Sequence, residues 1–226
     1  MSSATKSTLI AALLAFAVSF SACAARANSD TTANSTAAAS SDQTGTGQQR
    51  VVLAGGCFWG MEAVFESLRG VSSAVSGYAG GSRSTAHYEV VSTGLTGHAE
   101  SVEVTYDPAQ ISFEQLLAVY FLVAHDPTEL DRQGPDVGSQ YRSAIFYTTD
   151  AQRVAAERYI QGLQSRKVFQ APIVTQVVAL RGFYPAEDYH QHFVQRHPDY
   201  PYVVYNDLPK LDHLRQQFPS LVKAHS

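Results

Sequence analysis

Residues 51–68 read VVLAGGCFWGMEAVFESL, and this stretch predicts a strand, a sharp turn and a helix. Val51–Ala54 is a short apolar run of the kind found in buried strands. From Cys57 to Leu68, apolar residues recur at helical spacing and would share one face. The diglycine between the two segments lets the backbone turn sharply and approach a ligand closely. The pattern therefore predicts a helix whose first residue is a cysteine.

Two interpretations of Cys57 follow from that position. A thiol at a helix N-terminus meets unpaired N–H groups and the positive end of the helix dipole, which would lower its pKa toward the reactive thiolate. Alternatively, Cys57 is a small buried apolar residue, as many free cysteines are. The preceding Gly55-Gly56 favours the first interpretation, in which Cys57 is a nucleophile.

The first residues of the 226-residue chain have the features of an export signal. Leu9–Phe20 is apolar apart from one serine and is too short to span a bilayer. Ala25-Arg26-Ala27 is a cleavage motif, so residues 1–27 would form a signal peptide and the protein would be periplasmic. Alternatively, residues 20–23 (FSAC) resemble a lipobox, and cleavage before Cys23 would give a lipid-anchored membrane protein.

The remainder of the chain is predicted to be a tether followed by one domain. Residues 28–49 are rich in Ser, Thr, Ala, Gly and Gln, and such a segment cannot bury enough apolar area to fold. Residues 50–226 are long and apolar enough for a single core, and we expect a monomer. Loss of Lys6 and Arg26 with the leader changes the formal net charge from −4 to −6. With no basic run, nucleic acid is excluded as a partner.

A mixed pattern of strands and helices runs through the domain. Strands are predicted over 71–78, 98–106, 144–148 and 173–180, and helices over 112–123, 151–164 and 186–196. Ser112 and Asp150 are the expected helix caps. Because helices do not alternate regularly with strands, the pattern favours an α+β fold over a doubly wound sheet. The last thirty residues, rich in Tyr and Pro, are expected to be mostly irregular.

The strand over 98–106 points a carboxyl group toward the core. His98, Glu100, Val102, Val104 and Tyr106 share one face, and the apolar members make it the buried one. Burial raises the pKa of a carboxyl group, so Glu100 would be protonated near neutrality and could act as a general acid beside a thiol. The alternative is a buried glutamate that is satisfied by an arginine or by backbone donors.

Five more residues are candidates for the site, each with a structural alternative. Tyr78 ends its strand before a glycine turn and Tyr141 follows Gly138, but most of the twelve tyrosines must serve packing. Asp136 could simply cap its turn. Phe58 and Trp59 flank the thiol and could form an aromatic cup for a small apolar group, or fill the core.

Histidines near the C-terminus raise the question of a metal site. Residues 189–192 read YHQH, and His197 lies beyond them. The H-x-H pair suits a strand better than the helix expected here, and no carboxylate pattern accompanies it. We therefore predict no bound metal.

Five blocks of sequence together resemble the methionine sulfoxide reductase A family over about residues 51–200. The blocks are GCFWG at 56–60, GYAGG at 77–81, GHAE at 97–100, GSQYRS at 138–143 and EDYHQ at 187–191. The resemblance implies a ferredoxin-like α+β fold: a central mixed sheet flanked by helices. It also implies reduction of the S-epimer of methionine sulfoxide, free or in proteins, by the domain of residues 50–226.

Site roles follow from the resemblance residue by residue. Cys57 matches the nucleophile and Glu100 the acid. Tyr78 and Tyr141 match hydroxyls that bind the sulfoxide oxygen. The substrate-binding matches are Phe58 and Trp59, which would receive the S-methyl group, together with Asp136 and His190.

This sequence differs from many members of that family in how the enzyme can be regenerated. Residues 180–226 contain no cysteine that could form a disulfide with oxidised Cys57. Cys23 is the only other cysteine. Cleavage after residue 27 would remove it from the protein, and lipidation would block its thiol. We expect no bound cofactor and reduction of the sulfenic acid by an external thiol. The resemblance implies a thioredoxin-like protein, and dithiothreitol would serve in vitro.

Two other classes of function remain open from the residues alone. Cys57 could pair with His98 or His190 in a cysteine hydrolase. Alternatively, Phe58 and Trp59 could form the contact patch of a non-catalytic exported binding domain. Neither alternative gives a role to a buried glutamate opposite the thiol.

Overall fold

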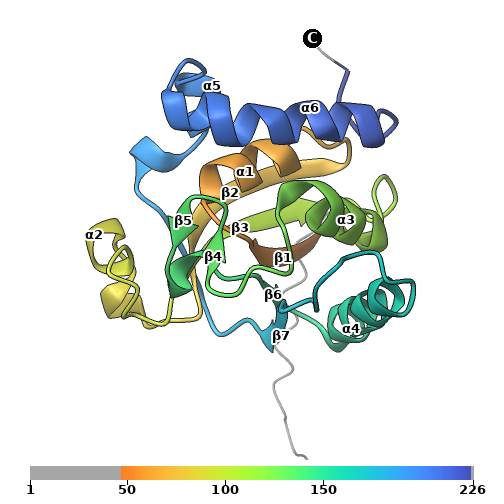
Figure 1. Cartoon of the computed structure of the whole chain (residues 1–226), viewed down its shortest axis with the longest axis horizontal. Helices are drawn as coiled ribbons and strands as arrows, with labels where there is room; N and C mark the ends of the chain where they lie inside the picture. The colour runs from red at the N-terminus through yellow and green to blue at the C-terminus, as the bar shows by residue number, and fades with distance from the viewer. Residues whose placement is uncertain (1–46, 225–226) are drawn as a thin grey trace, which may run out of the picture. The chain divides into compact units, whose positions relative to one another are not determined.

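Six strands form one mixed sheet in the order β7-β6-β1-β3-β2-β8. The first five strands of this order are labelled in Figure 1. The computed structural model describes residues 47–224. The strands are β1 (Gln49–Ala54), β2 (Val71–Ala79), β3 (Ala99–Tyr106), β6 (Ala144–Tyr147), β7 (Gln176–Ala179) and β8 (Phe183–Pro185). All neighbours are antiparallel except β6 and β7, which are parallel. A separate ribbon pairs β4 (Arg132–Gln133) with β5 (Asp136–Val137).

Helices connect these strands in a ferredoxin-like order. The α-helices are α1 (Phe58–Glu66), α2 (Tyr88–Val91), α3 (Phe113–Val119), α4 (Asp150–Ser165), α5 (Phe193–Arg196) and α6 (Leu208–Gln217). The series β1-α1-β2-β3-α3-β6 is a βαββαβ unit, and its strands lie in the sheet in the order fourth, first, third, second. The predicted α+β fold with a ferredoxin-like sheet is therefore confirmed.

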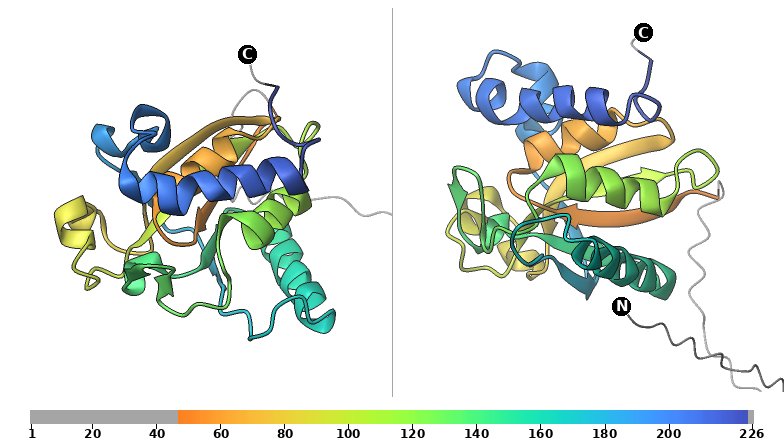
Figure 2. Two further views of the ribbon diagram at one scale, coloured as in Figure 1. Left: turned by 45° about the horizontal axis from the view of Figure 1, so that its top comes forward. Right: turned by 45° about the vertical axis from the view of Figure 1, so that its right-hand side comes forward.

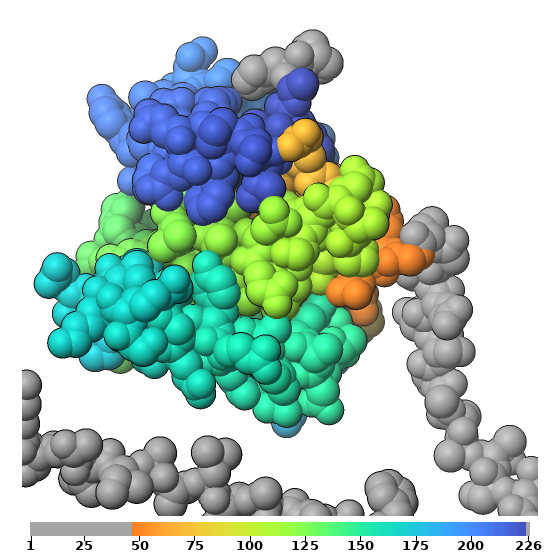
Figure 3. Space-filling view, turned by 90° about the vertical axis from the view of Figure 1, so that its right-hand side faces the viewer, coloured from red at the N-terminus to blue at the C-terminus, as the bar shows by residue number. Residues whose placement is uncertain are grey.

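The long helices cover one face of the sheet. Helix α1 packs on β2 and β3, and α6 lies over α1 on the side away from the sheet (Figures 1 and 2). Helices α3, α4 and α6 appear together on one side of the molecule (Figure 3). The main core includes Leu53, Phe65 and Val102 between the sheet and these helices. A smaller cluster around Val52 and Phe146 lies on the opposite face. Residues of β1 alternate between the two, as the period of a strand requires.

Two glycines set the position of α1. Gly56 has a φ of +95°, and a Cβ at this position would lie 2.6 Å from the Gln133 side chain. Cys57 then takes the N-cap position with extended geometry, so its side chain leaves the chain where the helix begins. Gly60 faces α6, where a Cβ would lie 2.1 Å from Asp207 Oδ1. The close approach of α1 to the C-terminal segment therefore requires glycine at position 60.

Several predicted boundaries need correction. The C-terminal segment is not mostly irregular, since a π-helical turn (Val203–Asp207) runs directly into α6. Thr149 rather than Asp150 caps α4, because its hydroxyl accepts the N–H of Gln152. Ser112 does cap α3, in a capping box with Gln115. The region predicted as a helix over 186–196 contains only a 3₁₀ turn and the short α5.

The predicted leader, both of its cleavage sites and Cys23 lie outside the described residues. The chain divides into two units, Met1–Ser41 and Asp42–Ser226, and residues 47–224 belong to the second. None of the helices within 47–224 is long and apolar enough to cross a membrane.

Replacing Gly60 with Ala should destabilise the protein although alanine favours helices. The new methyl group would overlap Asp207 Oδ1, and overpacking of this kind costs about 1–3 kcal/mol. Gly162→Ala in α4 is the matched control, because its Cβ would meet nothing closer than Arg166 Nη2 at 3.9 Å. That control should gain about 0.5–1 kcal/mol from helix propensity. Urea unfolding of both variants measures the difference, and equal shifts would contradict the packing argument.

Candidate active site

A pocket of about 190 Å³ opens at the amino end of α1. Its lining residues are Cys57, Phe58, Trp59, Tyr88, Glu100, Asp136, Tyr141, Tyr200 and Tyr202. Six of the eight residues predicted for the site are among them, whereas Tyr78 and His190 are not. The pocket therefore combines one thiol, two carboxyl groups and six aromatic side chains.

Cys57 is 8% exposed and lines this pocket. Burial raises its pKa well above the ordinary value, and the nearby Glu100 and Asp207 carboxyl groups raise it further. The backbone N–H of Trp59 and the Lys210 ammonium lower the pKa of Cys57, but their effects are weaker. The expected lowering of the pKa by the helix N-terminus is therefore wrong for the substrate-free protein. Cys57 is a protonated thiol until something changes its surroundings.

Glu100 lies on β3 with its side chain directed toward α1. It is 3% exposed, and its Oε2 accepts the backbone N–H of Phe58 at 3.1 Å. Burial raises the pKa of Glu100 to about 8, and the Asp136 carboxyl group adds to the effect. The bond from Phe58 opposes the shift without cancelling it. At pH 7 Glu100 therefore carries a proton, and because Oε2 accepts a bond, that proton belongs on Oε1.

Tyr88 and Tyr141 supply the hydroxyl-bearing walls near these two groups. Tyr141 lies in a 3₁₀ turn (Ser139–Tyr141), and Tyr88 opens α2. Burial is the main cause that raises the pKa of both phenols, and the Glu100 carboxyl group adds to it. Both side chains therefore keep their hydroxyl protons and can donate to an oxygen in the pocket.

The prediction that Tyr78 lines the site is corrected. Tyr78 is fully buried and pairs with Glu100 across β2 and β3, but its hydroxyl donates to Glu187 Oε2 at 2.8 Å. The other oxygen of Glu187 accepts the backbone N–H of Tyr88 at 3.0 Å. Tyr78 thus supports the segment that carries Tyr88. Sequence reasoning missed Tyr88, although it is the only aromatic residue between the glycines at 81 and 94.

Trp59 is held as a wall of the pocket by contacts on several sides. Its indole stacks on Phe193 with ring centroids 3.7 Å apart and planes 7° from parallel. Tyr200 and Tyr202 meet it edge-on, both at 85°. The indole N–H donates to His190 Nδ1 at 3.1 Å. The ring therefore has little freedom to turn away from the pocket.

His190 was predicted to bind substrate, and the structure places it behind the wall instead. It is buried against Phe58, Trp59 and Tyr88, and it does not line the pocket. Burial lowers its pKa, so the ring is neutral and its Nδ1 is free to accept from Trp59. His190 is therefore a positioning residue for the indole.

The C-terminal segment closes the remaining side of the pocket. Tyr202 donates its hydroxyl to Asp136 Oδ2, which joins this segment to β5. Asp207 is fully buried and lies 3.5 Å from Lys210 Nζ. The tyrosines at 200 and 202 were also missed from sequence, because the region was expected to be irregular. Their only signal was a Tyr-Pro-Tyr run close to the matched EDYHQ block.

No histidine from residues 47–224 lines the pocket. His98, one candidate partner for a hydrolase, directs Nε2 to the Ser82 carbonyl oxygen at 2.9 Å and accepts the Gly81 N–H through Nδ1. The thiol therefore faces a neutral carboxyl group and lacks the imidazole that acyl transfer would need as a base.

Comparison with known proteins agrees with this geometry. The family model described as peptide methionine sulfoxide reductase matches residues 49–221. A peptide methionine sulfoxide reductase MsrA 2 from Mesorhizobium japonicum is 56% identical over 175 residues, which cover 77% of this chain and 90% of the relative. One from Synechocystis is 54% identical over 183 residues, covering 81% and 86%.

Solved structures show the same fold. Reduced Mxr1 from Saccharomyces cerevisiae superimposes with a TM-score of 0.64 at 32% identity, covering 68% of this chain and 87% of that one. Methionine sulfoxide reductase A of Corynebacterium diphtheriae gives a TM-score of 0.59 at 35% identity, covering 68% and 76%.

A thiol and a neutral carboxyl group in an aromatic pocket, on a ferredoxin-like sheet, define a thiol-dependent oxidoreductase. The chain belongs to the peptide methionine sulfoxide reductase family, type A. It is an enzyme that reduces methionine sulfoxide, as the resemblance of its sequence blocks predicted.

Replacing Glu100 with Gln should stabilise the protein at neutral pH. The pKa of Glu100 is raised from 4.5 to about 8, so the stability linked to it is complete below about pH 4.5 and is lost as the pH rises toward 8. Glutamine is neutral throughout, so the variant should gain about 2–3 kcal/mol at pH 7 and almost nothing at pH 4. Urea unfolding at both pH values measures this gain. Glu114→Gln, on the exposed face of α3, is the control, and a gain independent of pH would contradict the assignment.

Proposed function

We propose that Cys57 attacks the sulfoxide sulfur while Glu100 protonates the sulfoxide oxygen. The observation that carries this proposal is the neutral Glu100 carboxyl group in the same 190 Å³ pocket as the thiol. Protonation makes the sulfur more electrophilic, and the buried setting strengthens each electrostatic contact. The Tyr88 and Tyr141 hydroxyls hold the oxygen as charge develops on it.

Because the pKa values of Cys57 and Glu100 are both raised, both groups begin the reaction protonated, and one proton can pass through Glu100 from the thiol to the sulfoxide oxygen. Glu100 gives its Oε1 proton to the sulfoxide oxygen, and the resulting carboxylate accepts the proton of the Cys57 thiol. Cys57 Sγ first bonds to the substrate sulfur, and the protonated oxygen then passes from that sulfur to Sγ as the bond between the two sulfurs breaks and methionine leaves. The substrate sulfur is reduced by two electrons and Cys57 is oxidised by two, to the sulfenic acid. Glu100 ends the step protonated, as it began.

The aromatic side of the pocket accounts for the choice of epimer. Phe58 and Trp59 form a fixed apolar wall that suits the S-methyl group, while the hydroxyls of Tyr88 and Tyr141 suit the oxygen. With the oxygen and the methyl group at different walls and the rest of the methionine chain directed out of the pocket, only one configuration at sulfur fits. Separate enzymes serve the two epimers, and the family resemblance assigns the S-epimer, free or within a protein, to this one.

An external thiol regenerates the enzyme, and a thioredoxin-like protein is the proposed reductant. Cys57 is the only cysteine within residues 47–224, so this part of the chain offers no second thiol to form a disulfide. The leader at residues 1–27 supports export, to the periplasm or to a membrane through lipidated Cys23, and the substrates would then be oxidised exported proteins.

A single turnover without reductant tests this proposal. The full chain is mixed with an equal amount of each separated epimer of methionine sulfoxide, and methionine is measured together with the mass of the enzyme. The S-epimer should give one methionine per enzyme and a sulfenic acid at Cys57 that dimedone traps. Cys57→Ser should give neither. Equal yield from both epimers would contradict the stereochemical assignment, and a disulfide to Cys23 would contradict reduction by an external thiol.

Substitution of the tyrosines separates the two that line the pocket from the one that does not. Tyr88→Phe and Tyr141→Phe should each slow the single-turnover step by about 10- to 100-fold, because each removes a donor to the developing oxyanion. Tyr78→Phe should slow it less than about threefold, since its hydroxyl contacts only Glu187. Stopped-flow tryptophan fluorescence follows the step, because Trp59 is the only tryptophan. A larger loss in Tyr78→Phe than in Tyr88→Phe would show that Tyr78, and not Tyr88, binds the sulfoxide oxygen.

A further inference from the structure

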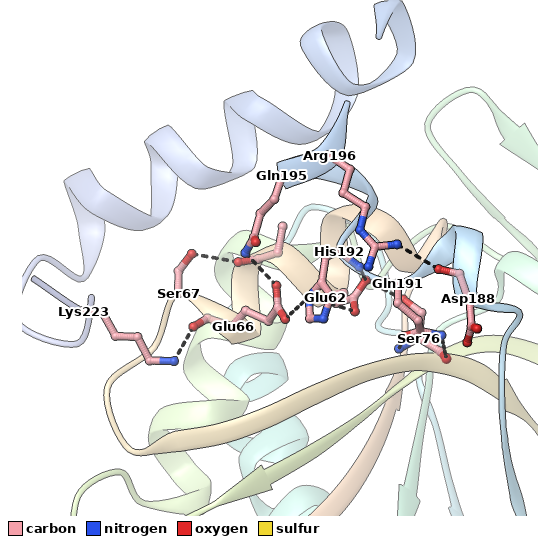
Figure 4. Close-up of polar contacts among 11 residues, drawn as sticks. Glu62, Glu66, Ser67, Ser76, Asp188, Gln191, His192, Gln195, Arg196 and Lys223 are labelled. Carbon is pink, nitrogen blue, oxygen red and sulfur yellow. Dashed lines mark hydrogen bonds and ion pairs between the residues drawn. The ribbon is translucent and has the colours of Figure 1, made fainter. Parts of the chain in front are cut away.

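Three side chains outside the pocket converge beside the second turn of α1 (Figure 4). Glu62 and Glu66 lie four residues apart on one face of this helix, and His192 comes from the segment between the EDYHQ block and α5. One ligand atom of each lies within 4.8 Å of those of the other two. His192 Nδ1 is 2.6 Å from Glu66 Oε1 and 3.9 Å from Glu62 Oε1. None of the three lines the catalytic pocket.

Glu62 is the unusual member of the group because it is 1% exposed and only half satisfied. Its Oε2 accepts hydrogen bonds from the Ser76 hydroxyl at 2.9 Å and from the backbone N–H of His192 at 3.0 Å. Its Oε1 is buried and has no hydrogen-bond partner among residues 47–224. A buried carboxylate oxygen without a partner is costly, and burial accordingly raises the pKa of Glu62 to about 7. The unpartnered oxygen belongs to the edge that faces Glu66 and His192.

We propose that Glu62, Glu66 and His192 bind one divalent transition-metal ion, of which Zn²⁺ is the representative. Carboxylate oxygen and imidazole nitrogen are both ligands of such ions, and three protein ligands leave a fourth position for water. Ligands at about 2.0–2.1 Å from zinc lie about 3.3 Å apart in a tetrahedral site. The observed separations of 2.6 and 3.9 Å bracket that value. The ion would replace the direct contact between His192 Nδ1 and Glu66 Oε1.

The surrounding contacts hold the ligands without using the atoms that the ion needs. Gln195 Nε2 donates to Glu66 Oε2 at 3.1 Å, which leaves Oε1 for the metal. Lys223 Nζ bonds the Glu66 backbone oxygen at 2.7 Å and so does not pair with the carboxylate (Figure 4). The His192 side chain is 45% exposed, which gives an ion a path from solvent.

The site would join the catalytic helix to the segment behind the pocket wall. Helix α1 begins beside Cys57, and His192 follows His190, which holds the Trp59 indole. A metal bridge would therefore fasten α1 to the chain that positions this wall. The H-x-H pattern gave no sign of Glu62 and Glu66, because these carboxylates lie about 130 residues earlier in the chain.

Zinc titration of the chelator-treated full chain tests the proposal. The titration is done in a Cys57→Ser background, because the active-site thiol could itself bind zinc. Calorimetry should show one saturable Zn²⁺ per chain and a rise in Tm on zinc addition. Even the loss of an outer-shell partner weakens metal binding by about 10–100-fold, so His192→Gln and Glu66→Gln should each weaken binding by at least about tenfold.

Matched controls make the result decisive. His213→Gln on α6 and Glu114→Gln on α3 change the same residue types at exposed positions and should leave zinc affinity within about twofold. Circular dichroism confirms that each variant is folded. The absence of saturable zinc binding would overturn the proposal. Zinc binding that is unchanged in both His192→Gln and Glu66→Gln would overturn it as well. The test is independent of catalysis, since Cys57→Ser has no turnover to lose.

Discussion

The hydrogen bond from the Phe58 N–H to Glu100 Oε2 ties the start of α1 to the centre of the sheet, across 42 residues of sequence. It gives one helix-terminal N–H a partner and gives one oxygen of a buried carboxyl group an acceptor role. The same bond brings the Cys57 side chain and the Glu100 side chain into one pocket. Without this bond, the Phe58 N–H and Glu100 Oε2 would each lack a hydrogen-bond partner within residues 47–224.

Helix α1 is the element through which the other parts of the molecule meet. Its first residues carry the thiol and the aromatic wall, and Gly60 allows the C-terminal segment to approach. Its second turn presents Glu62 to Ser76 of β2 and to the backbone of His192. The first turn of this nine-residue helix therefore carries the thiol and the wall, and its second turn makes the supporting contacts. Substitutions along this helix should affect the site even where they do not line it.

Local patterns predicted the centre of the site well and its rim poorly. The strand–glycine–helix stretch and the alternation of β3 were sufficient to place Cys57 and Glu100 on facing elements. Tyr88 was missed because a short helix within a loop has no periodicity that marks a buried face, and Tyr78 was chosen from its position beside a glycine turn. The pKa of Cys57 was misjudged because the helix N-terminus acts locally, whereas burial and the Asp207 carboxyl group come from distant parts of the chain. A single sequence does not show which residues far apart in the chain are in contact.

The volume of the pocket also limits what can reach Cys57. About 190 Å³ bounded by Trp59, Tyr200 and Tyr202 admits a single extended side chain and excludes a folded surface. An oxidised residue inside another protein must therefore emerge from its own packing before it can reach Cys57. Local opening of proteins spans free energies from nearly zero in loops to the full stability of the core. Under the proposed function, access to the enzyme would rank protein substrates by their own flexibility, and loops would be restored before cores.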